Sequence, residues 1–214
     1  AEASVKEQET QEFPGSVRGE VYLPTFSLDW NCAISVENGE ASSPDILQLV
    51  SAHKQKRVDV AVLQTSASEN MKGSRSFPPS YINFEKRLSA LGWTDLPRVP
   101  TPGVWGLTFW DQCFYVDEVQ YGSRISAIWS GVFPNIPQDF GAYLAQRGFS
   151  ANMNLSSAPA SKWRNAWCDV HSAYSHLHAG RDYFVSLNTN DFKGPAVAAL
   201  GLRALTPTEA IALV

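Results

Sequence analysis

Short apolar segments alternate with helix-forming segments along much of this chain, and this alternation limits the possible folds more than any other feature. VDVAVLQTS (58–66) and DYFVSLN (182–188) are short apolar runs typical of buried strands. SSPDILQLVSAHKQ (42–55) and SKWRNAWCDVHSAYSHLHAG (161–180) are typical of helices. Strands that alternate with helices predict an α/β fold with a central, mainly parallel sheet flanked by helices.

Further segments extend the same pattern. Ser43 is the expected cap of the helix in 42–55, with Pro44 in its first turn and Asp45 favoured by the helix dipole. The other expected strands are VYLPTFSLDWN (21–31) and LRALTP (202–207), and the other expected helices are 79–92, 193–201 and 206–214.

The chain divides into three kinds of segment. Residues 1–20 are polar and acidic, which predicts a flexible N-terminal arm. Residues 21–214 are expected to form a single domain. Within it, Pro- and Gly-punctuated residues 94–160 are expected to form an inserted subdomain, with strands in 108–119 and a short helix in 135–148.

Composition excludes several classes of protein. Hydrophobic residues make up 44% of the 214 residues, which is enough for a sizeable core. The net charge of −4 provides no overall positive field for nucleic acid, so such a binder would need a local basic patch. No apolar run is long enough for a membrane span. Three widely spaced cysteines do not make a disulfide framework, and we expect a reducing, cytoplasmic location.

Acidic residues follow the first two predicted strands. Asp29 ends the first strand, and Glu69 comes soon after the second. The helix between them descends about 18 Å, and the next strand climbs back about 20 Å. We therefore expect Asp29 and Glu69 at the same edge of the sheet, where ligands of such sheets collect.

A second group is expected at the same edge. Asp169, which we place near the start of its helix, is followed by a descent of about 15 Å and a strand that climbs about 16 Å. Asn188 and Asp191 then return to the level of Asp169. Carboxylates so gathered repel one another, and a hard cation that prefers oxygen ligands, Mg²⁺ or Mn²⁺, relieves that repulsion.

Four segments together resemble the PIN domain, a family of metal-dependent nucleases. FSLDWN resembles the family's opening strand with its hydrophobic-Asp-x-Asn pattern, and SASEN around Glu69 lies where the second acid stands. CDVHSAYSHLHAGRDYFVSLNTNDF resembles the third segment, and LGLRALTPTEAI the closing strand and helix. The resemblance covers roughly residues 20–70 and 160–212.

The resemblance implies a PIN-like fold and an endoribonuclease that leaves a 5′-phosphate and a 3′-hydroxyl. One or two Mg²⁺ or Mn²⁺ ions would lower the pKa of a bound water and neutralise the phosphate. The implied metal ligands are Asp29, Glu69, Asp169 and Asp191. Asn188 would be a neutral ligand or orient the water, and Asn31 and Ser186 would hydrogen-bond the carboxylates.

Two positions depart from the family pattern. Ser186 stands where Thr is commoner, and Asn188 where many members have Asp. The loss of one negative charge supports an alternative, a PIN-like scaffold that binds a protein or RNA partner without cutting. A toxin nuclease silenced by a cognate antitoxin is a second alternative. RNA is the favoured substrate, DNA remains open, and a homo-oligomer is compatible with the sequence.

Each acid also has an ordinary structural interpretation. In this interpretation Asp29 only caps a turn. Glu69 or Asp169 would interact favourably with the positive end of a helix dipole. Asp191 would cap the next short helix. Their joint arrival at one edge favours the metal site.

Other polar residues carry weaker signals. Lys72 and Arg75 are placed to hold a phosphate backbone, although a solvated loop explains them equally well. Aromatic residues of 94–160, such as Trp105 and Tyr115, would stack on bases or pack in the core. Cys168 and His171 make only half of a zinc site.

Overall fold

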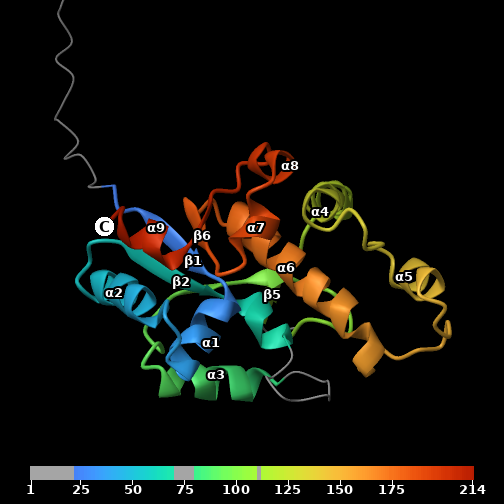
Figure 1. Cartoon of the computed structure of the whole chain (residues 1–214), viewed down its shortest axis with the longest axis horizontal. Coiled ribbons are helices and arrows are strands. Elements are labelled where there is room, and N and C mark those ends of the chain that lie inside the picture. The colour runs from blue at the N-terminus through green and yellow to red at the C-terminus, as the bar shows by residue number, and fades with distance from the viewer. Residues whose placement is uncertain (1–21, 70–79, 110–111) are drawn as a thin grey trace, which may run out of the picture.

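A five-stranded parallel sheet forms the centre of the molecule (Figure 1). The computed structural model describes residues 22–69, 80–109 and 112–214. In spatial order the strands are β3 (Arg98–Val99), β2 (Asp59–Leu63), β1 (Thr25–Leu28), β6 (Tyr183–Val185) and β7 (Ala204–Leu205). A separate parallel pair consists of β4 (Thr101–Pro102) and β5 (Cys113–Phe114). The predicted α/β class with a parallel sheet flanked by helices is confirmed.

Helices cover both faces of the sheet. One face carries α1 (Trp30–Asn38), α2 (Ser43–Lys54), α3 (Tyr81–Ala90) and α9 (Pro207–Ile211). The other carries α4 (Glu118–Val132), α5 (Phe140–Gln146), α6 (Ser161–His178), α7 (Thr189–Phe192) and α8 (Pro195–Ala198). The described part of the chain also includes the 3₁₀ helices η1 (Gln64–Ser68) and η3 (Ala158–Ala160). Figure 1 shows the strands between α2 and α6.

Alternating side chains of the strands build two cores. Phe26, Val60 and Val62 pack on the side of α1, α2 and α3. Ala61 and Phe184 point to the other side, toward α4 and α6. This period of two is the expected property of strands that are buried on both faces.

Several predicted boundaries change in the structure. The cap of α2 is Ser42 and not Ser43, because the Ser43 Oγ donates to the Ser35 carbonyl (2.8 Å) and so ties the helix to the end of α1. The strand expected over 58–66 ends at Leu63 as β2, and the remaining residues 64–66 belong to η1. Between 108 and 119, strand structure among the described residues is confined to β5.

Among the described residues, three α-helices were not predicted: α1, α4 and the four-residue α7. α1 begins directly after β1, with the Asp29 side chain as its cap, and ends at Gly39, whose φ of 63° is the left-handed conformation that glycine adopts freely. α4 is capped by Asp117 and buries Ile125, Ile128 and Trp129 on one face. The helix propensity of α4 is lowered by Gly122, Gly131 and several β-branched residues. Its helical pattern is therefore difficult to recognise in the sequence.

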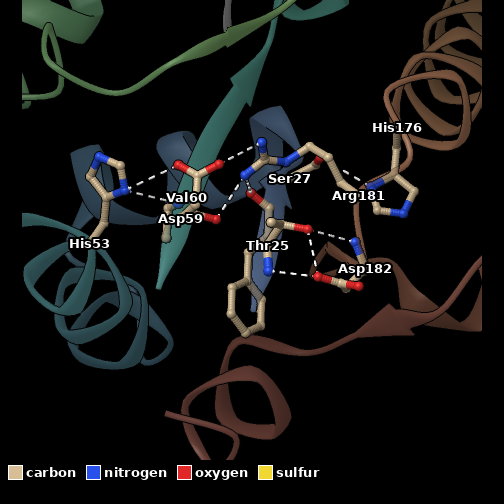
Figure 2. Close-up of polar contacts among 9 residues, drawn as sticks. Thr25, Ser27, His53, Asp59, Val60, His176, Arg181 and Asp182 are labelled. Atoms are coloured by element: carbon tan, nitrogen blue, oxygen red, sulfur yellow. Dashed lines mark hydrogen bonds and ion pairs between the residues drawn. The ribbon is translucent and has the colours of Figure 1, made fainter. Parts of the chain in front are cut away.

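A polar network ties the amino ends of the central strands together (Figure 2). Arg181 pairs with Asp59 (2.8 Å) and also donates to the Phe26 carbonyl (3.0 Å). Asp182 accepts hydrogen bonds from the Thr25 backbone N–H (2.8 Å) and hydroxyl (2.7 Å). Asp182 therefore has a structural role at the amino ends of the strands. The helices described here include none that is both long and apolar enough to cross a membrane.

Candidate active site

The sheet has a topological switch point between β1 and β6. From β1 the chain builds outward through β2 to β3, and it later returns to the other side of β1 to form β6 and β7. The carboxyl ends of β1 and β6 therefore border a crevice of the kind where open α/β sheets bind ligands. Asp29 directly follows β1, and Ser186 directly follows β6.

Asp29 is held in this crevice by three donors. Its Oδ1 accepts from the Trp30 backbone N–H (2.9 Å). Its Oδ2 accepts from Asn31 Nδ2 (2.7 Å) and from Ser186 Oγ (2.8 Å). Both hydrogen bonds expected from Asn31 and Ser186 are thus present. Burial raises the pKa of Asp29, and the three hydrogen bonds oppose that rise because they favour the carboxylate.

Ser186 and Asn31 also fix the turn that follows β6. The Ser186 oxygen accepts from the Asn188 backbone N–H (3.0 Å) and from Asn31 Nδ2 (2.9 Å). The Leu187 N–H donates to Asn31 Oδ1 (3.0 Å). The polar end of this strand therefore couples the turn to Asp29.

Glu69 and Asp169 lie close enough to Asp29 to respond to its charge. Burial raises the pKa of Glu69 well above its usual value, and the charges of Asp29 and Asp169 raise it further. Burial also raises the pKa of Asp169, with further contributions from Asp29 and Asp191. Charge interactions thus link all four predicted carboxylates in the structure.

Asp169 does not lie near the start of its helix, contrary to the sequence-based expectation. It comes eight residues after Ser161 (169 − 161), more than two turns into α6. An interaction with the helix dipole, which is confined to the first turn, therefore does not explain it.

Asp191 lies within the short helix α7 and caps neither this helix nor α8, whose cap is Gly194. Asn188 occupies the cap position of α7. The Asn188 side-chain amide donates to Asp191 Oδ2, so Asn188 orients this carboxylate. The structural interpretation of Asp191 as a helix cap is therefore wrong.

Two features near Glu69 were not predicted. Arg87 of α3 lowers the pKa of Glu69, although burial and the neighbouring acids outweigh it. Arg87 is also paired with Glu37 and stacks 4.5 Å from the centre of the Trp30 ring. The Ser66 hydroxyl lines the same small pocket as Glu69 and is buried without a hydrogen-bond partner. Arg87 stands in no quoted motif, because folding alone brings α3 beside η1, whereas Ser66 lies in SASEN but had no predicted role.

The predicted substrate-binding residues Lys72 and Arg75 lie outside the described residues. The zinc half-site does not form. His171 uses its ring nitrogens on Tyr121 (2.6 Å) and the Trp167 carbonyl (2.8 Å), while Cys168 Sγ lies 3.7 Å from the Ser68 carbonyl.

The donor set suits a hard divalent cation, although the side chains do not form a finished site. Within residues 22–69, 80–109 and 112–214, no three His, Cys, Asp or Glu side chains are grouped as a ready metal-binding cluster. The charges of Asp29 and Asp169 nevertheless raise the pKa of Glu69, those of Asp29 and Asp191 raise the pKa of Asp169, and a cation would relieve this repulsion. The oxygen donors match Mg²⁺ or Mn²⁺ in chemistry.

Comparisons with known proteins do not assign this chain to a family. No protein-family model matches it, and neither the curated proteins nor the solved structures searched include a match.

Proposed function

We propose that this protein is a metal-dependent nuclease that hydrolyses phosphodiester bonds in RNA. The observation that carries the proposal is Asp29, 4% exposed, at the switch point between β1 and β6. Three hydrogen bonds orient it, and two further acids, Glu69 and Asp169, share its electrostatic environment. Buried acids with raised pKa values in a crevice are typical of catalytic sites.

The resemblance of the third and fourth segments to PIN domains extends the proposal to the fold. The strand order β3-β2-β1-β6-β7 is compatible with a PIN-like sheet. Residues 94–160, which contain β3, β4, β5, α4, α5 and η3, are then an insertion between the shared segments that also supplies the edge strand β3 to the central sheet.

The polar residues of the site have two roles in this proposal, metal binding and orientation of Asp29. Asp29, Glu69, Asp169 and Asp191 would hold Mg²⁺ or Mn²⁺. The bound ion would supply a nucleophilic water at neutral pH and neutralise charge on the scissile phosphate. Asn31 and Ser186 keep the Asp29 carboxylate in one orientation, since both donate to its Oδ2.

Asn188 supports a second candidate, a scaffold that binds a partner without cutting. Asn188 has a neutral amide where many PIN domains have a carboxylate, and this amide donates a hydrogen bond to Asp191. Metal binding without cleavage would be the signature of that scaffold. A protein partner, such as an antitoxin, is compatible with both the nuclease and the scaffold.

Cleavage of end-labelled RNA and single-stranded DNA pools tests the proposal. The reactions contain Mn²⁺, Mg²⁺ or EDTA, and the proteins are wild type, Asp29→Asn and Asp95→Asn. Asp95 is an exposed carboxylate before β3, so Asp95→Asn is a matched control. We expect metal-dependent cutting of RNA that Asp29→Asn abolishes and Asp95→Asn leaves intact.

The other outcomes separate the candidates. Calorimetric Mn²⁺ binding without cleavage of either pool would favour the scaffold. Cutting confined to DNA would change the substrate class. Neither cutting nor Mn²⁺ binding would contradict both candidates.

A further inference from the structure

A cavity of about 300 Å³ lies between α4, α5 and α6. Its volume is at the lower end of the range of small-molecule sites. Five aromatic side chains contribute to its walls: Tyr121, Trp129, Phe140, Trp163 and Trp167. These rings provide broad apolar surfaces on which a flat molecule can stack.

Two of the three indole N–H groups of the walls are already used. Trp129 Nε1 donates to the Ile136 carbonyl (2.6 Å). Trp163 Nε1 donates to the Pro137 carbonyl (3.1 Å). A ligand therefore meets these two residues through their ring faces and edges and not through a free donor.

The hydroxyl and imidazole of the walls are also hydrogen-bonded to each other. His171 Nδ1 lies 2.8 Å from the Trp167 carbonyl and must donate, because that oxygen can only accept. Its Nε2 then accepts from the Tyr121 hydroxyl at 2.6 Å. The bonded groups of Tyr121, Trp129, Trp163 and His171 therefore leave a mainly apolar interior, which selects for the apolar part of a ligand.

The mouth of the cavity differs from its interior. Gln138 and Asp139 line it and are exposed. Asp139 Oδ1 accepts from the Ala142 N–H (2.7 Å) and caps α5. The residues that line the cavity, all within the described part of the chain, include this carboxylate but no Lys or Arg. A cation is therefore complementary both to Asp139 and to the negative faces of the aromatic rings.

We propose that this cavity binds a small aromatic amine, with its ring among the tryptophans and its ammonium group at the mouth beside Asp139. The proposal does not rest on nuclease activity. Trp167 and His171 are four residues apart and share one face of α6, whereas Asp169 lies between them in sequence and points to the other face. The amine site and the acidic site are thus separate.

Three probes of similar size but different charge test the proposal: 2-phenylethylamine, 2-phenylethanol and phenylacetate. Binding is followed by tryptophan fluorescence at pH 7, since Trp129, Trp163 and Trp167 line the cavity. We expect the amine to bind most tightly and phenylacetate most weakly. Equal affinity for all three probes would overturn the assignment of a cation.

Asp139→Asn isolates the charge, because asparagine is as good a helix cap as aspartate. We expect this variant to bind the amine about threefold to fivefold more weakly and the alcohol unchanged. Asp117→Asn is the matched control, since Asp117 caps α4 but does not line the cavity. Unchanged amine affinity in Asp139→Asn would contradict the proposed contact.

Leu107→Trp tests whether the cavity itself is the site. Leu107 lines it and is 8% exposed, so a larger side chain would fill the space. We expect binding of all probes to be lost while circular dichroism and the melting temperature show a folded protein. If the larger side chain unfolds the protein, Ile125→Phe replaces it as a milder filling variant of another lining residue. Failure of wild type to bind any probe, or full binding by a folded filled variant, would overturn the site.

Discussion

Asp29 joins local structure to the candidate chemistry, because its carboxylate connects the start of α1 to the end of β6. Oδ1 caps α1 through the Trp30 N–H, whereas Oδ2 receives the Asn31 and Ser186 side chains. The carboxylate is therefore held in place before any ligand arrives. Substitution of the residues that orient Asp29 should therefore lower activity more than it lowers stability.

Ser186 offers a test of this orientation. Ser186→Ala removes the hydrogen bond to Asp29 and the acceptor for the Asn188 N–H. We expect nuclease activity, and Mn²⁺ affinity measured by calorimetry, to fall about 10- to 100-fold. Ser186→Thr retains the hydroxyl and should keep most of the activity. Equal losses in both variants would show that packing, and not the hydrogen bond, matters at this position.

Asp169 should make the protein less stable at neutral pH when no metal is bound. Its pKa is raised in the folded state, so the folded protein binds more protons than the unfolded chain in the window above the ordinary aspartate pKa. The stability contribution of Asp169 therefore falls as pH rises through that window. We expect Asp169→Asn to raise the free energy of unfolding by about 1 kcal/mol at pH 7 in EDTA and to abolish cutting.

Urea unfolding at pH 4 and pH 7 checks this sign, since the gain should shrink toward pH 4. Mn²⁺ should reverse the order of stability. At a concentration of 100 times its Kd, it would stabilise wild type by about 2.7 kcal/mol and the variant by less. A variant that is less stable than wild type in EDTA would contradict the electrostatic explanation.

At the scale of elements, the separate β4–β5 pair contacts η1, the segment that leads to Glu69. Thr101 of β4 is hydrogen-bonded to Thr65 of η1 (3.1 Å). Gln112, just before β5, accepts from Gln64 of η1 (2.7 Å). The same 3₁₀ helix leads directly to Glu69, so this pair of strands packs against the segment that carries one of the acids.

Trp105 and Tyr115 follow these two strands and are 82% and 84% exposed. We expect them to stack on bases of single-stranded substrates, at about 1–3 kcal/mol per base. Trp105→Ala and Tyr115→Ala should each raise KM about tenfold or more with little change in kcat. Leu47→Ala, at an exposed apolar position on α2, is the control. A fall in kcat at unchanged KM would argue against stacking.

At the scale of the whole molecule, α6 and the sheet are joined by a buried histidine. His176 is fully buried and its Nδ1 lies 3.0 Å from the Ser27 hydroxyl of β1 (Figure 2). Burial, helped by the charge of Arg181, lowers the pKa of His176 to about 4. The folded protein therefore binds fewer protons than the unfolded chain between about pH 4 and the ordinary histidine pKa of about 6.5.

Stability contributed by His176 should consequently rise with pH across this window and be lost below it. We expect wild type to lose on the order of 3 kcal/mol from this residue between pH 6.5 and pH 4. His176→Gln should have a shallower dependence of unfolding free energy on pH over the same range. Parallel pH profiles for the two proteins would show that His176 is not held neutral.

Much of this organisation could be predicted from local patterns. Apolar runs at 58–66 and 182–188 contain β2 and β6, and the helix predicted over 161–180 is α6. Local patterns failed at α1, which is short and shares Asp29 with the end of the strand. They failed also at α4, whose glycines and β-branched residues weaken its propensity.

By itself, the sequence determined the α/β class and the placing of Asp29, Ser186 and Asn188 at strand ends, because the strand and helix periods are local properties of the chain. Only the tertiary structure decided that β6 lies beside β1. That pairing creates the switch point and joins Ser186 to Asp29. Tertiary packing likewise placed Arg87 near Glu69 and formed the cavity against α6. These contacts join residues far apart in the chain, and long-range packing, which no local period encodes, brings them together.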